Sequence, residues 1–173
     1  MFDPTVFDNL KVVLEGAIYD LDLNENEHIE IIDRSDTVDL AKMSRSYSIS
    51  LSRGKVESVI ELSTDALNWS GEILAPDQDN YPCQLYVEFL LKITDVNHDC
   101  SAIRFRLNQI WKTFKPKIEQ NISFLYGDAS EIYDNQIILS FKEEIDESFI
   151  IDIPFIIECA LNTLEALEMF AHQ

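Results

Sequence analysis

The fold is decided in the last quarter of the chain, which runs NQIILSFKEEIDESFIIDIPFIIECALNTLEALEMF from Asn135 to Phe170. Its first part, 136–141, has the β-branched and aromatic composition of a strand. An acidic turn and a mostly apolar run lead from there to Pro154. Proline suits the first turn of a helix, because the N–H that it lacks would have no partner there. We therefore predict a strand followed by a long helix over 154–171.

The predicted C-terminal helix is more apolar than an ordinary surface helix. At helical spacing, only a narrow strip is polar, made of Glu158, Asn162, Glu165 and Glu168. The apolar stripe is wide enough to meet a sheet and extends past the part that a sheet would cover. We expect a second subunit or a bound partner to cover the rest, with Phe155, Met169 and Phe170 as contact residues.

Strict alternation of polar and apolar residues predicts antiparallel strands upstream of this segment. The clearest strand is 83–93, in which every second residue from Cys83 to Ile93 is apolar. Its other face is mixed, which indicates a sheet with one partly wet face. Gly54 sits in a turn that joins two strands into a hairpin. The remaining strands are expected at 28–32, 46–52, 56–62 and 121–126.

Apolar residues at helical spacing predict three more helices. They are expected at 4–21 with Asp3 as N-cap, at 65–74 with Asp65 or Thr64 as cap, and at 101–115 with Asp99 or Ser101 as cap. Residues 34–44 fit a short helical turn, while 118–126 fit either a helix or a strand, with the strand favoured by composition. The sum is an α+β fold, an antiparallel sheet with N-terminal, central and C-terminal helices packed on it, in a single domain over 1–173.

Composition predicts a soluble, cytoplasmic protein. Hydrophobic residues make up 46% of the 173 residues, enough for a core. The longest apolar runs fall far short of the roughly 20 residues that a bilayer requires. The N-terminus carries Asp3 where a signal peptide needs basic residues. Three cysteines without C-x-x-C spacing form an odd set, which indicates a reducing compartment.

The net charge of -19 makes nucleic acid a poor direct partner. A basic island interrupts this acidic chain and consists of Arg104, Arg106, Lys112, Lys115 and Lys117. The favoured interpretation is that these bases pair with the chain's own carboxylates. The alternative is a docking site for an acidic partner segment, with Arg104 and Arg106 as contacts. Trp69, between Asn68 and Ser70, is a further candidate contact because aromatic residues are enriched at interfaces.

Two sequence patterns imitate functional sites but lack features that those sites require. Asp20-x-Asp22-x-Asn24-x-Asn26 begins like an EF-hand loop, yet Glu25 replaces the required glycine and Ile31 the closing glutamate. His98, Asp99 and Cys100 contain the residue types of a nucleophilic set, but adjacent residues on one turn rarely aim at one atom. The four glycines stand alone, without a phosphate-binding motif. We therefore predict no catalytic residue, no metal site and no cofactor.

The order of the predicted elements resembles the type III secretion chaperone-like fold, a superfamily of small acidic proteins that includes bacterial sensory-transduction regulators. Its members run helix, antiparallel strands, helix, two strands and a long C-terminal helix. The resemblance implies a dimer that binds an extended partner segment without chemistry. It covers the order of elements only and carries no site residue, and the region 34–82 contains an extra hairpin or insertion.

Three functions remain open from the sequence. The first is a non-catalytic, chaperone-like or adaptor protein that binds protein partners and self-associates as a homodimer. The second is an acidic decoy that inhibits a nucleic-acid-binding protein, which the charge of -19 favours. The third is an enzyme whose site is assembled only by the fold, since a fold alone does not exclude activity.

Overall fold

The computed structural model describes residues 5–22, 28–74, 81–141 and 144–172. Its centre is a six-stranded antiparallel sheet in the order β1-β2-β3-β4-β6-β5. The strands are β1 (Glu30–Asp39), β2 (Ser44–Arg53), β3 (Val56–Thr64), β4 (Gln84–Ile93), β5 (Lys117–Ser123) and β6 (Tyr133–Ser140). The helices are α1 (Val6–Asp22), α2 (Ala66–Leu74), α3 (Val96–Ile110) and α4 (Ile153–Glu168), and the short 3-10 helix η1 (Glu147–Ile151) precedes α4. This architecture confirms the predicted α+β fold.

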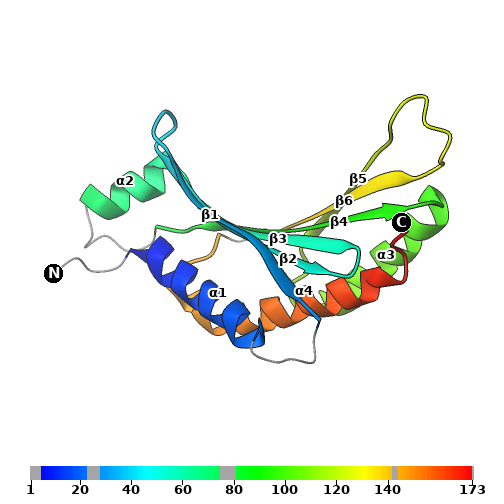
Figure 1. Ribbon diagram of the computed structural model, residues 1–173. Helices are drawn as coiled ribbons and strands as arrows, with labels where there is room; N and C mark the ends of the chain where they lie inside the picture. The colour runs from blue at the N-terminus through cyan, green and yellow to red at the C-terminus, as the bar shows by residue number, and fades with distance from the viewer. Residues whose placement is uncertain (1–4, 23–27, 75–80, 142–143, 173) are drawn as a thin grey trace.

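Helices α1, α3 and α4 lie on one face of the sheet (Figure 1). Helix α4 contacts the central strands β2, β3 and β4, and the other two helices pack on either side of it. Helix α2 follows β3 and lies at the end of the sheet near the β1–β2 turn. Among the described residues, no helix is both long and apolar enough to cross a membrane.

The core fills the space between α4 and the sheet. Alternate residues of β2, β3 and β4 point toward the helices and are buried, as the period of two requires. Helix α4 contributes a broad buried surface to the same core. Its buried residues are Ile153, Ile156, Ile157, Cys159, Ala160, Leu161, Thr163, Leu164 and Leu167. The surplus apolar surface predicted for this helix is therefore covered largely by the chain itself.

Strand β1 is longer than predicted and replaces the helical turn expected over 34–44. It pairs with β2 along nearly its whole length, from Glu30 opposite Ser52 to Asp39 opposite Ser44. Its charged side chains meet α1, because Arg34 binds Glu15 at 2.6 Å and Asp36 binds Lys11 at 2.5 Å. A strand with so few apolar residues is held by its partner strand and by these ion pairs.

Helix α3 begins at Val96, five residues before the predicted start at 101, and neither Asp99 nor Ser101 is its N-cap. The cap is Asp95, whose side chain accepts a hydrogen bond from the His98 backbone N–H at 2.9 Å. The Asp99 side chain in turn accepts a hydrogen bond from the Asp95 backbone N–H at 3.1 Å. This reciprocal arrangement satisfies two backbone donors at the helix start, which is why Asp95 prevails over the later candidates.

Strand β5 also differs from the prediction, because it covers Lys117–Ser123 and not 121–126. Phe124, Leu125 and Tyr126 follow the strand and are exposed in the loop that leads to β6. Their β-favouring composition led to the wrong boundary. Residues 117–123 form the strand because they pair in register with β6, from Lys117 opposite Ser140 to Ser123 opposite Asp134.

One buried hydrogen bond joins α4 to the end of α3 and gives a test of the packing. The Trp111 Nε1–H donates to Thr163 Oγ1 at 2.9 Å, and both side chains are buried. Thr163→Val keeps the side-chain shape but leaves the indole N–H without an acceptor. We expect the free energy of unfolding to fall by about 1–3 kcal/mol. Urea denaturation followed by circular dichroism measures this loss.

The control for this prediction is Thr113→Val, which changes an exposed threonine. It should alter the free energy of unfolding by less than about 0.5 kcal/mol. Equal stabilities for Thr163→Val and the parent chain would show that the bond does not contribute.

Candidate functional site: the open face of the sheet

The face of the sheet that points away from α1, α3 and α4 carries no described helix (Figure 1). Its side chains are the alternate residues between the buried positions. On β2 they are all serines: Ser46, Ser48, Ser50 and Ser52. On β3, β4 and β6 they mix acidic, amide, hydroxyl and apolar side chains, and β4 adds one base, Lys92. We call this surface, over β2, β3, β4 and β6, the open face.

The registers of β3, β4 and β6 arrange the open face in three cross-strand rows. The rows are Glu57–Leu90–Gln136, Val59–Glu88–Ile138 and Glu61–Tyr86–Ser140. Neighbouring strands lie about 4.8 Å apart, so members of one row are in van der Waals reach. Each row thus joins one carboxylate to at least one apolar or aromatic side chain.

The three carboxylates of these rows have no cationic partner among the described residues. Glu88 accepts a hydrogen bond from Gln136 Nε2 at 2.7 Å, a neutral donor. Burial, with a further contribution from the charge of Glu88, raises the pKa of the Glu61 carboxyl above its ordinary value of 4.5. A partly desolvated carboxylate without a counter-ion, as at Glu61, destabilises the isolated chain. A cationic partner would remove that penalty.

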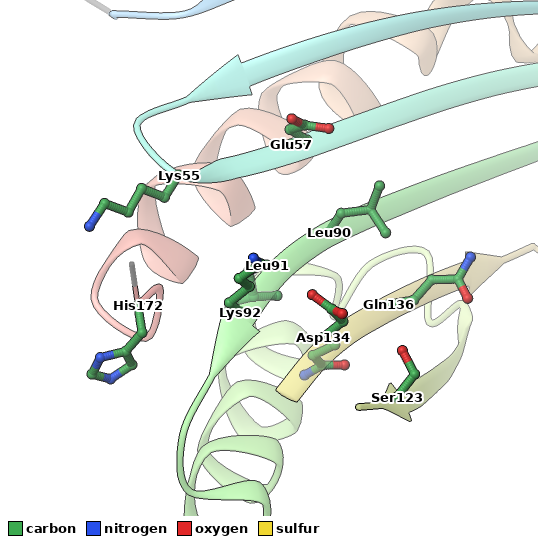
Figure 2. Close-up of a pocket in the computed structure, with 10 residues that line it drawn as sticks. Lys55, Glu57, Leu90, Leu91, Lys92, Ser123, Asp134, Gln136 and His172 are labelled. Carbon is green, nitrogen blue, oxygen red and sulfur yellow. The ribbon is translucent and has the colours of Figure 1, made fainter. Parts of the chain in front are cut away.

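At one end the open face deepens into a pocket of about 710 Å³. Figure 2 shows Lys55 and His172 on one side of this pocket and Ser123 and Gln136 on the other. The other lining residues are Glu57, Leu90, Leu91, Lys92, Asp134 and Asn135. The His172 backbone N–H donates to the Lys92 carbonyl at 2.9 Å, which fixes the C-terminal segment at the rim. Acidic and basic groups alternate around the pocket, so it has no single charge preference.

Exposed apolar residues lie at two opposite ends of the open face. At one end is the β5–β6 loop with Phe124, Leu125 and Tyr126, the last 95% exposed. The Phe124 ring packs edge-on against Tyr133, with ring centroids 6.0 Å apart. At the other end, Leu40 and other apolar residues are exposed on the β1–β2 turn and α2. Figure 1 shows both ends rising above the open face, which gives this side of the molecule a saddle shape.

The contact residues predicted from the sequence do not gather at one place. Phe155 and Met169 are 42% and 68% exposed, but 14 residues of helix separate them by about 21 Å. The Phe155 ring packs on Phe114 with centroids 5.4 Å apart. Phe170 is only 9% exposed and belongs to the core, so it is not a surface contact. Trp69 is half-buried on α2.

Most of the basic island lies on and just after α3, whereas Lys117 is the first residue of β5 and lies opposite Ser140 of the open face. Arg104 and Arg106 are exposed on α3 and flank Phe105, which is exposed as well. Within the described chain, Lys117 pairs with Glu119 at 2.9 Å, whereas the other bases of the island pair with no carboxylate. Among the described residues, the interpretation that the island pairs with the chain's own acids is therefore met by Lys117 alone and not by these four bases: Arg104, Arg106, Lys112 and Lys115.

The residues that imitate catalytic or metal sites are not assembled into one. His98 Nδ1 lies 3.1 Å from Asp99 Oδ1, and this hydrogen bond raises the pKa of the His98 imidazole. The Cys100 thiol lies 3.9 Å from Asn135 Nδ2, and burial raises its pKa, which disfavours the reactive thiolate. No group of three or more potential metal ligands occurs among the residues that the structure describes. Asn24 and Asn26 of the EF-like pattern lie outside that part.

Comparisons of the chain with protein-family models, with curated proteins and with solved structures find no match.

Sequence reasoning missed the carboxylates of the open face. The alternation over 83–93 indicated a mixed, partly wet face, which includes Glu88 and Leu90. The rows, however, depend on the register between strands far apart in the sequence, such as Glu88 opposite Val59 and Ile138. The signal that could have found them is the order of the predicted strands. If 46–52, 56–62 and 83–93 are paired as three consecutive antiparallel strands, Glu61 and Glu88 come close together.

The raised pKa of Glu61 predicts how stability depends on pH. The folded chain holds this proton more tightly than the unfolded chain, so the penalty is absent well below pH 4.5. It develops as the pH rises through the raised folded-state pKa and is complete above it. We expect Glu61→Gln to be more stable than the parent at pH 7 and equally stable at acidic pH. Urea denaturation at a series of pH values gives the comparison.

The matched control is Glu158→Gln, which removes an exposed carboxylate on α4. It should shift the free energy of unfolding by less than about 0.5 kcal/mol at pH 7. A Glu61→Gln variant that is less stable than the parent at pH 7 would contradict the described electrostatics.

Proposed function

We propose that the protein is a non-catalytic, cytoplasmic protein-interaction domain, of the chaperone-like or adaptor kind, that acts as a homodimer. The observation that carries the proposal is the one-sided sheet: helices cover one face, and the other exposes apolar side chains beside unpaired carboxylates. The unpaired, partly desolvated carboxylate of Glu61 lowers the stability of the isolated chain, and a bound protein with a cationic group would offset that cost. Binding therefore accounts for a surface that folding alone does not favour.

The order of elements supports the proposal. Helix α1, four antiparallel strands, α3, the strands β5 and β6, and α4 follow one another as in the type III secretion chaperone-like fold, with α2 inserted before β4. Members of that superfamily bind protein partners and do not catalyse reactions. We extend that mode of action to this chain as a proposal.

Exposed apolar residues on the helix side support self-association. Ile151 is 86% exposed just before α4, and Phe155, one turn later, is 42% exposed. Phe155 also belongs to a cluster of aromatic rings with Phe114 and Phe149. Aromatic side chains that continue from a packed cluster into solvent are typical anchors of protein interfaces. We propose this end of α4 as the dimer contact.

The open-face carboxylates also favour the alternative, an acidic decoy for a nucleic-acid-binding protein. Such a decoy binds mainly through charge, so its affinity falls steeply as salt rises. An adaptor that uses apolar side chains retains most of its affinity at high salt. The salt dependence of partner binding therefore separates the two functions.

The solution mass of the purified chain tests the dimer. We expect about twice the chain mass of 20.0 kDa by light scattering. The double variant Ile151→Ser with Phe155→Ser should shift the equilibrium to the monomer, because it removes the apolar contact. Leu125→Ser, which changes a residue that is 76% exposed in the distant β5–β6 loop, should stay dimeric. A parent chain that remains at 20.0 kDa at high concentration would contradict the homodimer.

A further inference from the structure

We infer that the open face of the sheet binds a basic amphipathic helix of a partner protein, with its apolar stripe on β3, β4 and β6 and its Lys or Arg side chains on Glu57, Glu61 and Glu88. The inference rests on the proposed interaction function and names the chemistry of the partner.

Apolar side chains supply the first part of the surface. Val59, Leu90 and Ile138 lie on three adjacent strands and are partly exposed, with Tyr86 beside them. Polar side chains adjoin them in the cross-strand rows, and no described helix lies over the centre of this face (Figure 1). A ligand with an apolar stripe would remove this area from water, which is favourable by about 25 cal/mol per Å².

Charge complementarity supplies the second part. The row pattern places each carboxylate next to an apolar residue: Glu57 beside Leu90, Glu88 beside Val59 and Ile138, and Glu61 beside Tyr86. Lys and Arg side chains fit such a pattern, since their aliphatic stems lie along apolar surface while the charged ends reach the acids. No described base forms an ion pair with these acids, although Lys55 and Lys92 line the pocket together with Glu57. An acidic partner would meet repulsion here.

The secondary structure of the partner follows from backbone hydrogen bonding. A segment on the face of a sheet meets side chains and cannot pair with the strand backbones, whose N–H and C=O groups already bond within the sheet. An extended segment would leave its own backbone groups unsatisfied against the apolar rows. A helix satisfies them internally, which is also why helices cover the opposite face.

The size of the surface fits a short helix. Glu57 and Glu61 are four residues apart on one strand, about 13 Å, and the four strands β2, β3, β4 and β6 span about 14 Å. A helix of three turns is about 16 Å long and covers this area. The pocket of about 710 Å³ at the end of the face leaves room for a larger side chain beyond the last turn.

A second copy of this chain fits the surface less well. Helix α3 is its basic helix, with Arg104 and Arg106 exposed, but α3 lies on the opposite side of the sheet from the open face. A contact between α3 of one copy and the open face of the next joins two different surfaces. Repetition of such a contact gives an open chain of molecules and not a closed dimer. The occupant is therefore a different protein.

Fluorescence anisotropy with designed peptides tests the inference. The probe is a labelled 18-residue amphipathic helix with a leucine stripe flanked by lysines. Two comparison peptides are used. In the first, glutamates replace the lysines; the second has the composition of the lysine peptide in scrambled order. We expect the lysine helix to bind, the glutamate helix not to bind, and the scrambled peptide to bind at least about tenfold more weakly.

Two matched variants assign the binding to the open face. Glu61→Gln with Glu88→Gln keeps the side-chain shapes and should weaken binding of the lysine helix by at least about tenfold, which corresponds to 1.4 kcal/mol. Glu158→Gln with Glu165→Gln removes the same charge from the solvent side of α4 and should leave the affinity unchanged. Circular dichroism of both variants confirms that they remain folded.

Several outcomes would overturn the inference. Equal binding of the ordered and scrambled lysine peptides, with equal losses in both double variants, would show diffuse attraction to an acidic protein. Concentration-dependent assembly that only the Glu61/Glu88 variant abolishes would show a second copy on the face. If the parent chain is a dimer but does not bind the lysine helix, this inference is wrong and the proposed interaction function stands. If the parent chain is a monomer and does not bind the lysine helix, the inference and the proposed function are both wrong.

Discussion

The burial of α4 against the centre of the sheet is the contact on which the rest of the structure depends. This helix contacts β2, β3 and β4 and touches both α1 and α3, and β1 and β6 pair with strands that it covers. Its buried residues include Ile156, Ala160 and Leu164, none of which is exposed to solvent.

This contact makes the sheet one-sided. The buried apolar residues of the central strands point toward α4, and the period of two places their neighbours, Val59 and Leu90 among them, on the opposite face. On the edge, α1 is joined to β1 and β2 by charge, with Arg45 binding both Asp8 at 2.9 Å and Asp36 at 3.1 Å. The acids of this edge are neutralised by bases, whereas those of the open face are not. The contrast within one sheet is the reason to regard the open face as a binding surface.

The sequence predicts those parts of the fold that depend on local pattern. Alternation over 83–93 and helical spacing before and after it place β4, α1 and α4 within a few residues. Parts that depend on distant partners were missed. Strand β1 contains Asp33, Arg34 and Asp36 and becomes a strand only through β2 and α1. The start of α3 depended on a competition among three capping residues that the sequence alone did not resolve.

The candidate site was less predictable than the fold for the same reason. Single residues such as Phe155 and Met169 were identified from one helix and are exposed, while the rows of Glu57, Glu61 and Glu88 exist only once three strands are in register. The most direct measurement is a methyl NMR titration with the lysine helix. We expect chemical-shift changes confined to the methyl groups of Val59, Leu90 and Ile138. Shifts at Val12, Ile151 and Met169 on the helix side, with an unchanged open face, would contradict this expectation.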